Sequence, residues 1–280
     1  MEATKAVRAV PITNGLSELI RYRHLLVSLA WRDVRVRYKQ SLLGIAWAVL
    51  LPLSMMLIFT FVFTRAIDAA KVLDVNMPYA LYAYTGLVPW TFFSMSLSGC
   101  VNSLVANRNL VTKVYFPREV FPLASIAGSA VDFAIAMTML AVLAAYFHCF
   151  SDWSFRPRAT LLFLPVVVLV QVVLTTGLGM LLAMANLFYR DVRQVLSAVV
   201  QLWMFVSAVV VPVPRDGSWL ARIIAINPMV PLIDAYRDCV VHGRLPGPAG
   251  FFYTTVVALV LLVGGWSCFR RASYRFAECI

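Results

Sequence analysis

Six long segments with almost no charge constrain the fold of this chain more than any other feature. Each is at least as long as the roughly 20 residues with which an α-helix crosses about 30 Å of hydrocarbon. Lipid offers no hydrogen-bond partners to the backbone, so a segment at that depth must be helical or part of a closed barrel. The sequence therefore predicts an all-α polytopic membrane protein with six transmembrane helices, at residues 42–64, 79–106, 120–147, 159–189, 194–214 and 245–269.

Composition supports the membrane assignment. Hydrophobic residues make up 61% of the chain and charged residues 13%, with a mean hydropathy of +0.82. In a soluble protein a net charge of +11 would suggest a nucleic-acid partner. Here the basic residues adjoin apolar segments, where they meet anionic lipid headgroups. We therefore expect membrane lipids, and no nucleic acid, as partners.

Lysine and arginine are distributed unevenly between alternate loops. One side, made of both termini with residues 107–119 and 190–193, carries 16 of these residues, and the other side carries 8. Because basic loops stay in the cytoplasm, both termini are expected there. The expected parts are a cytoplasmic N-terminal segment (1–41), a six-helix transmembrane domain (42–269) and a cytoplasmic tail (270–280). A charged leader of about 40 residues argues against a cleavable signal peptide.

The stretch WRDVRVRYKQS directly precedes the first apolar segment. At 100° per residue, Val27, Trp31, Val34, Tyr38 and Leu42 fall on one side of a helix, and the charged residues spread over the rest. This pattern is typical of an amphipathic helix on a membrane surface. The same stretch also alternates between apolar and basic residues, which leaves a half-buried strand as the alternative, although that strand would have no sheet to join.

The segment RDGSWLARIIAINPMVPLIDAYRDCVVHGRLPGPAG, before the last apolar segment, is too apolar for a solvated loop. Asn227-Pro228 and Pro231 divide it into residues 219–226 and 230–241. Each piece can form a helix of about 12–18 Å, which is too short to cross a bilayer. We interpret the two pieces as re-entrant half-helices at the mouth of a pathway. A pair of interfacial helices is the alternative.

A short helix is also expected in NRNLVTKVYFPREVFP, between the second and third apolar segments. Asn107 or Asn109 can cap this helix, and Pro117 would end it. Its exposed apolar and basic positions suit a docking site for a cytosolic partner or, equally, an amphipathic connector that rests on the headgroups.

The chemistry that the chain lacks narrows its function. The sequence contains no GxxxxGK[ST] phosphate-binding loop, so any use of ATP requires another polypeptide. His148 and His242 fall near aspartates on the expected outer side, but no spacing there requires a metal. Cys149 and Cys239 fall on the same side, where a disulfide or ordinary packing is open to them. We expect no catalytic residue, metal or cofactor on this chain.

Few polar side chains interrupt the apolar segments. Asp132 is the one ionisable residue within them. We expect it to form a hydrogen bond or salt bridge between helices, with substrate contact as the alternative. Gln171, Asn186 and Gln201 are expected to form interhelical hydrogen bonds.

Aromatic residues are frequent in the first, second and fifth apolar segments. Phe59 and Phe63 lie four residues apart and therefore share one helical face. Such rings offer sugar rings an apolar surface along which to slide, and packing against lipid or within the core is the alternative. The candidates for the lining of a pathway are Phe59, Phe63, Tyr82, Trp203 and Phe205.

Three stretches, RDVRVRYKQSLLGIAWAVLLPL, NLVTKVYFPREVFPLASI and INPMVPLIDAYRDCVVHG, resemble the membrane subunits of type-2 ABC exporters of lipid-linked polysaccharides, such as O-antigen, teichoic acid and some capsules. The resemblance covers residues 16–275 in the same order. It implies a homodimer of six-span protomers in the bacterial cytoplasmic (inner) membrane. It also implies two copies of a cytoplasmic ABC ATPase subunit, which binds ATP and Mg²⁺, and a lipid-linked polysaccharide as the substrate.

The resemblance further implies roles for particular segments. The interface helix along the membrane includes Trp31, Arg32, Arg35, Arg37, Tyr38 and Lys39. The coupling helix that enters a groove on the ATPase includes Asn107, Arg108, Leu110, Val111, Lys113, Val114, Tyr115 and Phe116. The outer gate includes Trp219, Ile223, Asn227, Pro228, Asp234 and Arg237.

Two other functions also fit the composition. An ABC exporter of another amphiphile, a lipid or a drug, would not strand lipid-linked glycan inside the cell when it is lost. An integral-membrane glycosyltransferase or acyltransferase would need acid and base groups gathered on one membrane face.

Overall fold

The computed structural model describes residues 18–39, 41, 43–63, 78–113, 116–151, 153, 159–189, 191–211, 219–273 and 276. All regular structure within these residues is helical, so the helix expected before the first apolar segment is confirmed and the strand alternative is wrong. The elements are α2 (Arg23–Tyr38), η1 (Gly44–Ala46), α3 (Trp47–Phe61), α5 (Tyr79–Ala106), α6 (Arg108–Lys113), α7 (Val120–Phe150), η3 (Ala159–Phe163), α8 (Leu164–Phe188), α9 (Val192–Val206), α10 (Trp219–Ile226), α11 (Met229–Arg237), η4 (Asp238–His242) and α12 (Pro248–Ser273).

Four segments of the described chain are long and apolar enough to cross a membrane. They are Gly44–Phe61, Val120–Phe150, Ala159–Phe188 and Pro248–Ser273. The second expected span is a helix with the expected bounds, α5, but it contains several tyrosines and serines and is not one of those four. The fifth, α9, has only 15 residues. It ends at Val206, short of the expected boundary at residue 214.

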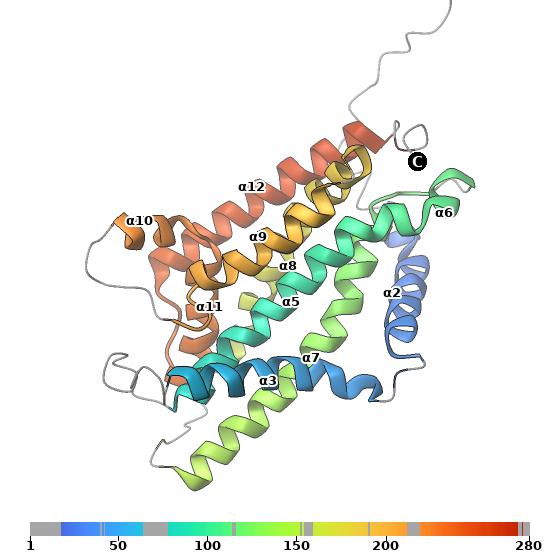
Figure 1. The fold of residues 1–280 in the computed structure, drawn as a ribbon. Coiled ribbons are helices and arrows are strands. Elements are labelled where there is room, and N and C mark those ends of the chain that lie inside the picture. Colours follow the sequence, from blue (N-terminus) through green and yellow to red (C-terminus); the bar gives the residue numbers. More distant parts are fainter. Residues whose placement is uncertain are drawn as a thin grey trace, which may run out of the picture.

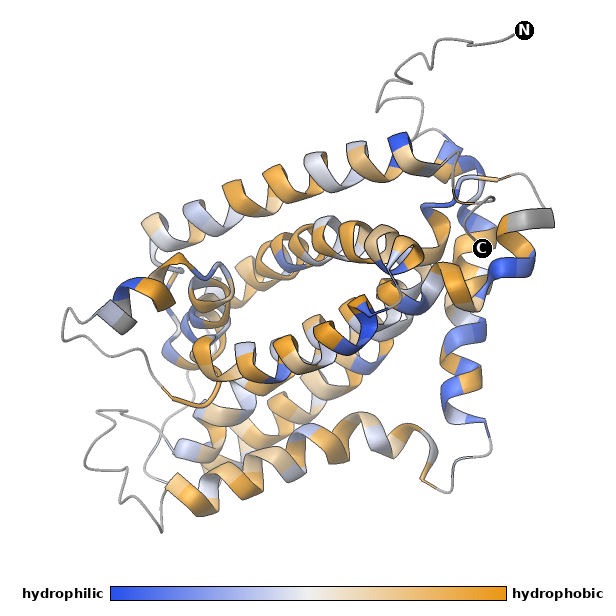
Figure 2. Ribbon diagram, turned by 45° about the horizontal axis from the view of Figure 1, so that its top comes forward, coloured by the Kyte–Doolittle hydropathy of each residue, from blue (hydrophilic) through white to orange (hydrophobic). Residues whose placement is uncertain are grey.

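The long helices run between two ends of the molecule (Figure 1). At one end lie α6 and the C-terminal part of α12, and at the other lie α10 and α11; we call these the α6 end and the α11 end. Helix α2 runs along α7 from the α6 end, and α3 crosses α7 and α5 rather than lying parallel to them. Hydrophobic residues cover the long helices, whereas hydrophilic residues gather on α2 and around the α6 end (Figure 2).

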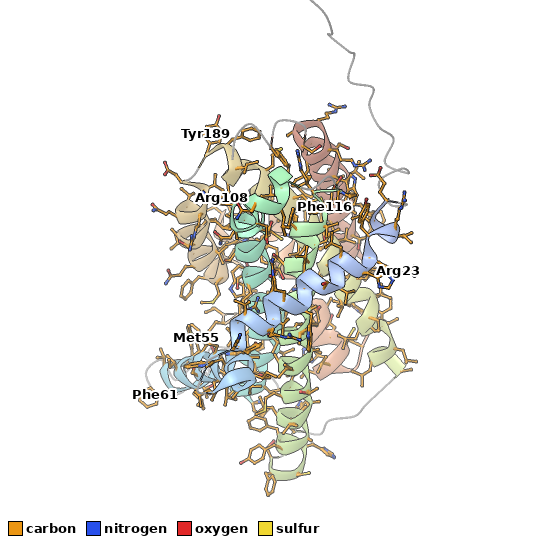
Figure 3. The ribbon with its side chains drawn as sticks, turned by 90° about the vertical axis from the view of Figure 1, so that its right-hand side faces the viewer. Arg23, Met55, Phe61, Arg108, Phe116 and Tyr189 are labelled. Atoms are coloured by element: carbon orange, nitrogen blue, oxygen red, sulfur yellow. The ribbon has the colours of Figure 1, made fainter. Side chains whose placement is uncertain are left out.

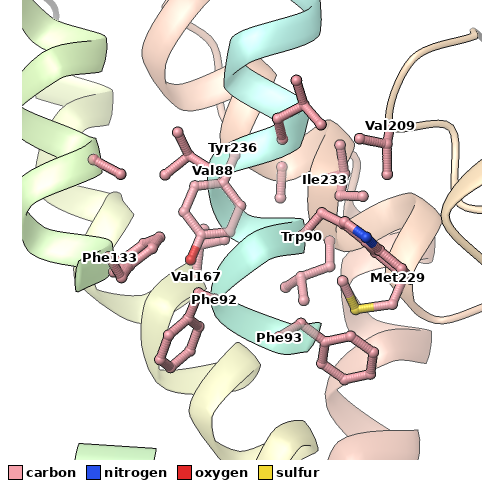
Figure 4. Close-up of a cluster of buried hydrophobic side chains, with 14 of the residues drawn as sticks. Val88, Trp90, Phe92, Phe93, Phe133, Val167, Val209, Met229, Ile233 and Tyr236 are labelled. Atoms are coloured by element: carbon pink, nitrogen blue, oxygen red, sulfur yellow. The ribbon is translucent and has the colours of Figure 1, made fainter. Parts of the chain in front are cut away.

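Helix α5 forms the centre of the apolar core. It packs against α7, α8, α9 and α11, and Tyr84, Phe93 and Leu97 are completely buried. Figure 4 shows how α5, α7 and α11 meet in this core. The ring of Phe92 in α5 lies 5.0 Å from that of Phe133 in α7, which in turn lies 6.2 Å from that of Tyr236 in α11. The half-helix α11 is therefore embedded in the protein core and does not lie on its surface.

Helices α8 and α12 touch backbone to backbone. A methyl group on Gly177 would come within 2.5 Å of the Leu261 carbonyl carbon and the Leu262 nitrogen, and one on Gly265 would overlap the Gly177 carbonyl oxygen. In lipid, where apolar burial gives helices little reason to associate, close backbone approach at small residues is a main source of packing energy. The two glycines therefore set the distance between these helices.

Gly265→Ala is expected to lower the stability of the protein by about 1–3 kcal/mol, because the new methyl group meets a backbone oxygen that cannot rotate away. Thermal unfolding of the purified protein in detergent measures the effect. Gly264→Ala is the matched control, since a methyl group there meets no atom within 4 Å. Equal melting temperatures for the two variants would show that the α8–α12 distance is not fixed by this contact.

Candidate functional sites at the two ends of the bundle

Asp132 of α7 holds the end of α2. One of its carboxylate oxygens accepts a hydrogen bond from Arg37 Nη1, in an ion pair, and the other accepts one from the Tyr38 hydroxyl. The side chain of Asp132 is 6% exposed and that of Arg37 is 31% exposed. The prediction of a bond between helices is therefore confirmed, and its partners are residues of the helix that precedes the first span.

The phenol of Tyr38 remains a proton donor in this site. Burial, together with the hydrogen bond to Asp132, raises the pKa of Tyr38 to about 12. A phenol with that pKa is neutral at physiological pH. Asp132 thus receives one charged and one neutral donor, which together satisfy a carboxylate placed beside apolar surface.

The apolar stripe expected on α2 divides into two surfaces. Val34 is buried against α7 together with Leu29 and Ala30. Val27 and Trp31, in contrast, are 63% and 57% exposed. One surface of α2 therefore packs on the bundle, and the adjoining surface is open to lipid or to another protein.

A direct bond joins α2 to Asn107, the residue between α5 and α6. Arg32 Nη2 donates to Asn107 Oδ1 at 2.8 Å and to Asp33 Oδ1 at 2.9 Å. Asn107 Nδ2 in turn donates to the Ser103 carbonyl oxygen in the last turn of α5. The Asn107 side chain thus accepts a hydrogen bond from α2 and donates one to α5. It links the expected interface helix, the end of α5 and the start of the expected coupling helix.

The expected coupling residues fall into three groups. Arg108 and Asn109 are exposed at the α6 end, where Figure 3 shows Arg108, Phe116 and Tyr189 together. Val111 is only 3% exposed, so the prediction that it is an exposed docking position is wrong. It packs with Leu110, Phe116 and residues of α2, α8 and α12 in an apolar cluster at this end. Val114, Tyr115 and the side chain of Lys113 lie outside the described residues.

Arg270, near the end of α12, ties together elements that are far apart in the sequence. Its Nε donates to Glu119 Oε1 at 2.7 Å, and its Nη2 donates to Glu18 Oε2 at 3.2 Å. Glu119 is buried, and Phe276 packs its ring against that of Phe269 at 5.1 Å. Sequence analysis did not identify this network. The signal was present, because Glu119 and Arg270 are charges at the ends of two spans on the same expected side.

At the α11 end, the backbone of α9 is interrupted before the expected span is complete. Residues 207–211 form turns, and Ala208 has φ 53°, in the left-handed region. Three side chains satisfy the carbonyl oxygens that the interruption frees. Asn227 Nδ2 donates to Val206 O at 3.1 Å, Arg237 Nη2 to Val209 O at 2.8 Å and the Tyr79 hydroxyl to Val210 O at 3.0 Å.

Arg237 is a cation buried at this interruption, with a residue exposure of 3%. Its guanidinium lies 3.7 Å from the centre of the Tyr82 ring, and Nη1 lies 3.3 Å from Asp234 Oδ1. Gly86 provides the space, because a methyl group there would lie 2.5 Å from Val209 O and 2.7 Å from Arg237 Nη2. Through its stacking on Tyr82 and its hydrogen bond to the Val209 carbonyl oxygen, Arg237 holds α11 against α5 and the end of α9. The ion pair with Asp234 orients the guanidinium.

The other expected gate residues lie in two environments. Asn227 is buried, and besides Val206 O its side chain bonds Ser207 Oγ at 2.9 Å and accepts from the Met229 N–H. The Pro228 carbonyl oxygen accepts from Thr254 of α12. Trp219 and Ile223, on α10, are 73% and 51% exposed. Residues of the expected gate therefore form a fixed base on α11 and an open rim on α10.

The aromatic candidates divide in a similar way. The Phe59 ring lies 6.4 Å from those of both Phe63 and Phe205, and Phe63 stacks on Tyr79 at 5.5 Å. This row joins the ends of α3 and α9, and Phe205 is 54% exposed. Trp203 instead packs edge-on against Trp90 and Phe93 in the core, and Tyr82 is buried under Arg237. Phe59 and Phe63 are half-buried and Phe205 is exposed; we call these three residues the open aromatic surface.

Two of the three expected polar links between spans are confirmed. Gln171 Nε2 donates to the Pro89 carbonyl oxygen at 2.7 Å and its Oε1 accepts from the Tyr236 hydroxyl at 2.5 Å. Asn186 Nδ2 donates to Val101 O at 2.8 Å. Gln201 is exposed on α9 and makes no hydrogen bond within the described residues, so the expected link at that position is wrong for the single chain.

Acid and base groups do not converge on one site in the part of the chain that the structure describes. The same residues contain no group of three or more side chains with metal-ligand chemistry. Asp234 pairs with Arg237, and Asp238 bonds Arg244 at 2.6 Å. Cys149 and Cys239 are both free thiols, the first exposed and the second buried.

Comparison with known proteins relates the chain to transporters. The family model described as ABC-2 type transporter matches residues 24–241. The chain is 32% identical to the O-antigen export system permease protein RfbA of Myxococcus xanthus, over 94% of this chain and 98% of that protein. It is 29% identical to RfbA of Klebsiella pneumoniae, over 91% and 95% of the two chains. It is 22% identical to the polysialic acid transport protein KpsM of Escherichia coli, over 87% and 91%.

The ion pair between Arg37 of α2 and Asp132 of α7 predicts unequal losses of stability when one or the other partner is replaced. Arg37→Gln should cost about 1–2 kcal/mol, because it leaves a buried carboxylate with one neutral donor. Asp132→Asn should cost less, because the partly exposed Arg37 side chain can reach water. Thermal unfolding in detergent measures both changes, and limited proteolysis reports release of α2.

Arg35→Gln is the matched control, since Arg35 is exposed on the same helix. Exposed charges of this kind contribute little to stability. If Arg35→Gln and Arg37→Gln had the same effect, the ion pair with Asp132 would not be what anchors α2.

Proposed function

Because the chain belongs to the ABC-2 type transporter family, as a permease subunit without an ATPase domain, we propose that it forms the membrane path of an ATP-driven exporter of lipid-linked, O-antigen-like polysaccharide. The observation that carries this proposal is the match over nearly the full length of relatives named for O-antigen export. A relative named for polysialic acid transport matches 87% of the chain. Both names refer to long glycans, and this favours a polysaccharide over a drug or a simple lipid.

The proposed topology has six spans, formed by α3, α5, α7, α8, α9 and α12, with both termini in the cytosol of a bacterium. At 1.5 Å per residue, the 28 residues of α5 reach about 42 Å. Helix α9 reaches only about 22 Å on the same basis, and the residues that follow it, 207–211, form turns and bends. The proposed cytosolic side is the α6 end, since the loops that carry most of the basic residues belong to it.

The proposed assembly is a homodimer with two ATPase subunits, which bind the ATP and Mg²⁺. The segment from Asn107 to Phe116 would dock on the ATPase through its exposed residues, Arg108 and Asn109 among them. The buried side of the same segment lies in the apolar cluster with Leu29 and Ala30 of α2. A displacement of α6 would therefore move α2 with it.

The path of this movement continues into the spans. The Arg32–Asn107 bond connects the middle of α2 to the residue that precedes α6, and Arg37 and Tyr38 connect the C-terminal end of α2 to α7. Since α2 is a helix between two polar attachments, it can act as a rigid lever between the ATPase and the bundle. Such rigid elements with discrete contacts are how two-state transport cycles are driven.

The open aromatic surface of Phe59, Phe63 and Phe205 is proposed to line the path near the α11 end. Flat rings present apolar area to the C–H faces of sugars without binding their hydroxyl groups, so a chain can pass. The polar cluster around Arg237 is proposed as the base of the outer gate, with Trp219 and Ile223 on α10 as its exposed rim. This assignment is supported by the half-helix geometry, which is how transporters place irregular backbone at membrane depth.

The function can be tested by complementation in cells that make the glycan but lack this chain. Such cells should retain lipid-linked polysaccharide on the cytosolic side and lose it from the surface. The wild-type gene and Arg222→Glu, at the α11 end, should restore export, whereas Arg108→Glu should not, because it reverses a charge on the proposed docking helix. Surface labelling of the glycan and co-purification of the ATPase provide the readouts.

Val111→Asp is not a suitable test of docking, because it would bury a carboxylate in the apolar cluster.

Full export by the deletion strain would contradict the proposed cargo. Export and ATPase binding by Arg108→Glu at the level of Arg222→Glu would contradict the docking assignment alone.

The gate leads to a separate prediction for Arg237→Lys. Lysine keeps the charge but loses the planar stack on Tyr82 and the fork that reaches both Val209 O and Asp234. The closed state of the gate should become less stable by about 2–3 kcal/mol. Vesicles that contain the exporter should then leak small solutes without ATP. Arg222→Lys, an exposed arginine on α10, is the control, and equal leak from the two variants would show that Arg237 does not hold the gate closed.

A further inference from the structure

A recess of about 350 Å³ lies between α5 and α9 near the α6 end. Val101 of α5 and Leu196 of α9 are its buried apolar residues. The remaining residues that line it are polar: Ser98, Asn102, Arg193, Gln194 and Ser197. A polar recess between two helices of a membrane bundle is unusual, because each such group loses its water partners in lipid.

The polar residues continue along each helix beyond the recess. On α9, Gln194, Ser197 and Gln201 are spaced by three and four residues and all three are exposed. On α5, Ser94, Ser98 and Asn102 are spaced by four residues. These spacings place each set on one helical face. The recess is therefore the place where two polar stripes meet, and this face of the bundle is suited to water or a polar ligand rather than to lipid tails.

Arg193 provides the charge of the recess. Within the described residues its side chain makes no hydrogen bond or ion pair, and neither does the side chain of Gln194. Asp191, the nearest carboxylate in the sequence, does not line the recess. Ser197 and Asn102 each use one donor locally, on Gln194 O and Ser98 O at 2.8 Å. A guanidinium with amide and hydroxyl groups around it is the donor set that binds phosphate oxygens.

The surroundings of the recess distinguish a lipid phosphate from a soluble anion. The recess lies at the end where Tyr189 and Arg108 lie, which is the proposed cytosolic headgroup level. On the helical face that carries Arg193, α9 continues with Val200 and Met204, seven and eleven residues further on, which are half-buried apolar side chains. An amphiphile can thus place its phosphate beside Arg193 and keep its hydrocarbon chain against apolar surface.

We propose that the recess between α5 and α9 binds a phosphate group of the lipid-linked export substrate, with Arg193 as the cation that recognises it, where the substrate enters the path. The proposal rests on the function proposed above and adds to it a position for the anionic group that joins lipid to glycan.

Binding of farnesyl diphosphate to the purified permease–ATPase complex, by calorimetry with saturating Mg-ADP on the ATPase, tests this site. Arg193→Gln should weaken binding roughly tenfold, because a charge-assisted hydrogen bond is worth that much or more. Arg271→Gln, an exposed arginine at the same end, should leave it unchanged. Ser197→Asp should weaken binding by repulsion, whereas Ala198→Asp, on the next residue and outside the recess, should not.

Inorganic pyrophosphate and farnesol are the two companion probes. Pyrophosphate should bind more weakly than farnesyl diphosphate but with the same dependence on Arg193, and farnesol should show no dependence. Equal effects of Arg193→Gln and Arg271→Gln would overturn the site. Pyrophosphate binding as tight as that of farnesyl diphosphate would overturn the assignment to a lipid phosphate. Either result leaves the complementation experiment, which tests polysaccharide export itself, unaffected.

Discussion

Backbone carbonyls at the end of α9 determine how the α11 end is built. In the proposed topology α9 stops inside the bilayer, where neither water nor lipid can satisfy its last carbonyl oxygens, and each such group costs several kcal/mol. The chain meets this cost with Asn227, Arg237 and Tyr79, which bond the oxygens of residues 206, 209 and 210. Two of these donors come from the half-helix segment and one from α5. The interruption of α9 therefore requires the half-helices to be where they are, and Gly86 gives the arginine room to reach its acceptor.

Polar links of this kind also specify how the other helices sit. Apolar packing alone discriminates poorly among helix positions in lipid, because lipid tails are as apolar as the side chains. Directional bonds at Asp132, Gln171, Asn186 and Arg270 each join elements distant in the sequence. They are few, and each is buried or partly buried, so a shift of one helix by a turn would leave a polar group unpaired. The same bonds that fix the resting arrangement thus define which helices can move together.

The sequence predicted the elements well because their signals are local. The bounds of α5, α10 and the start of α7 agree with the expected ranges, since hydrophobic length, proline and asparagine positions act within a few residues. The end of α9 was wrong because nothing local stops a helix in SAVVVPVP before its prolines. The stop depends on donors some 20 to 130 residues away. Val111 was likewise misplaced, because its burial depends on α2, α8 and α12, which no periodicity within a six-residue helix can report.

The exposed surfaces of α3 and α9 differ in a way that bears on where a path can lie. Those of α3 are apolar, with Leu51, Leu57 and Phe61 at 49%, 57% and 69%, so lipid can cover them at no cost in hydrogen bonds. Helix α9 has an exposed apolar side as well, but also the exposed stripe of Gln194, Ser197 and Gln201, which lipid would leave unsatisfied. In the proposed homodimer the polar stripe of α9 therefore belongs on the wet side of the interface. The substrate's phosphate then meets the polar part of α9 near Arg193, and its first sugars meet the aromatic part of the same helix at Phe205.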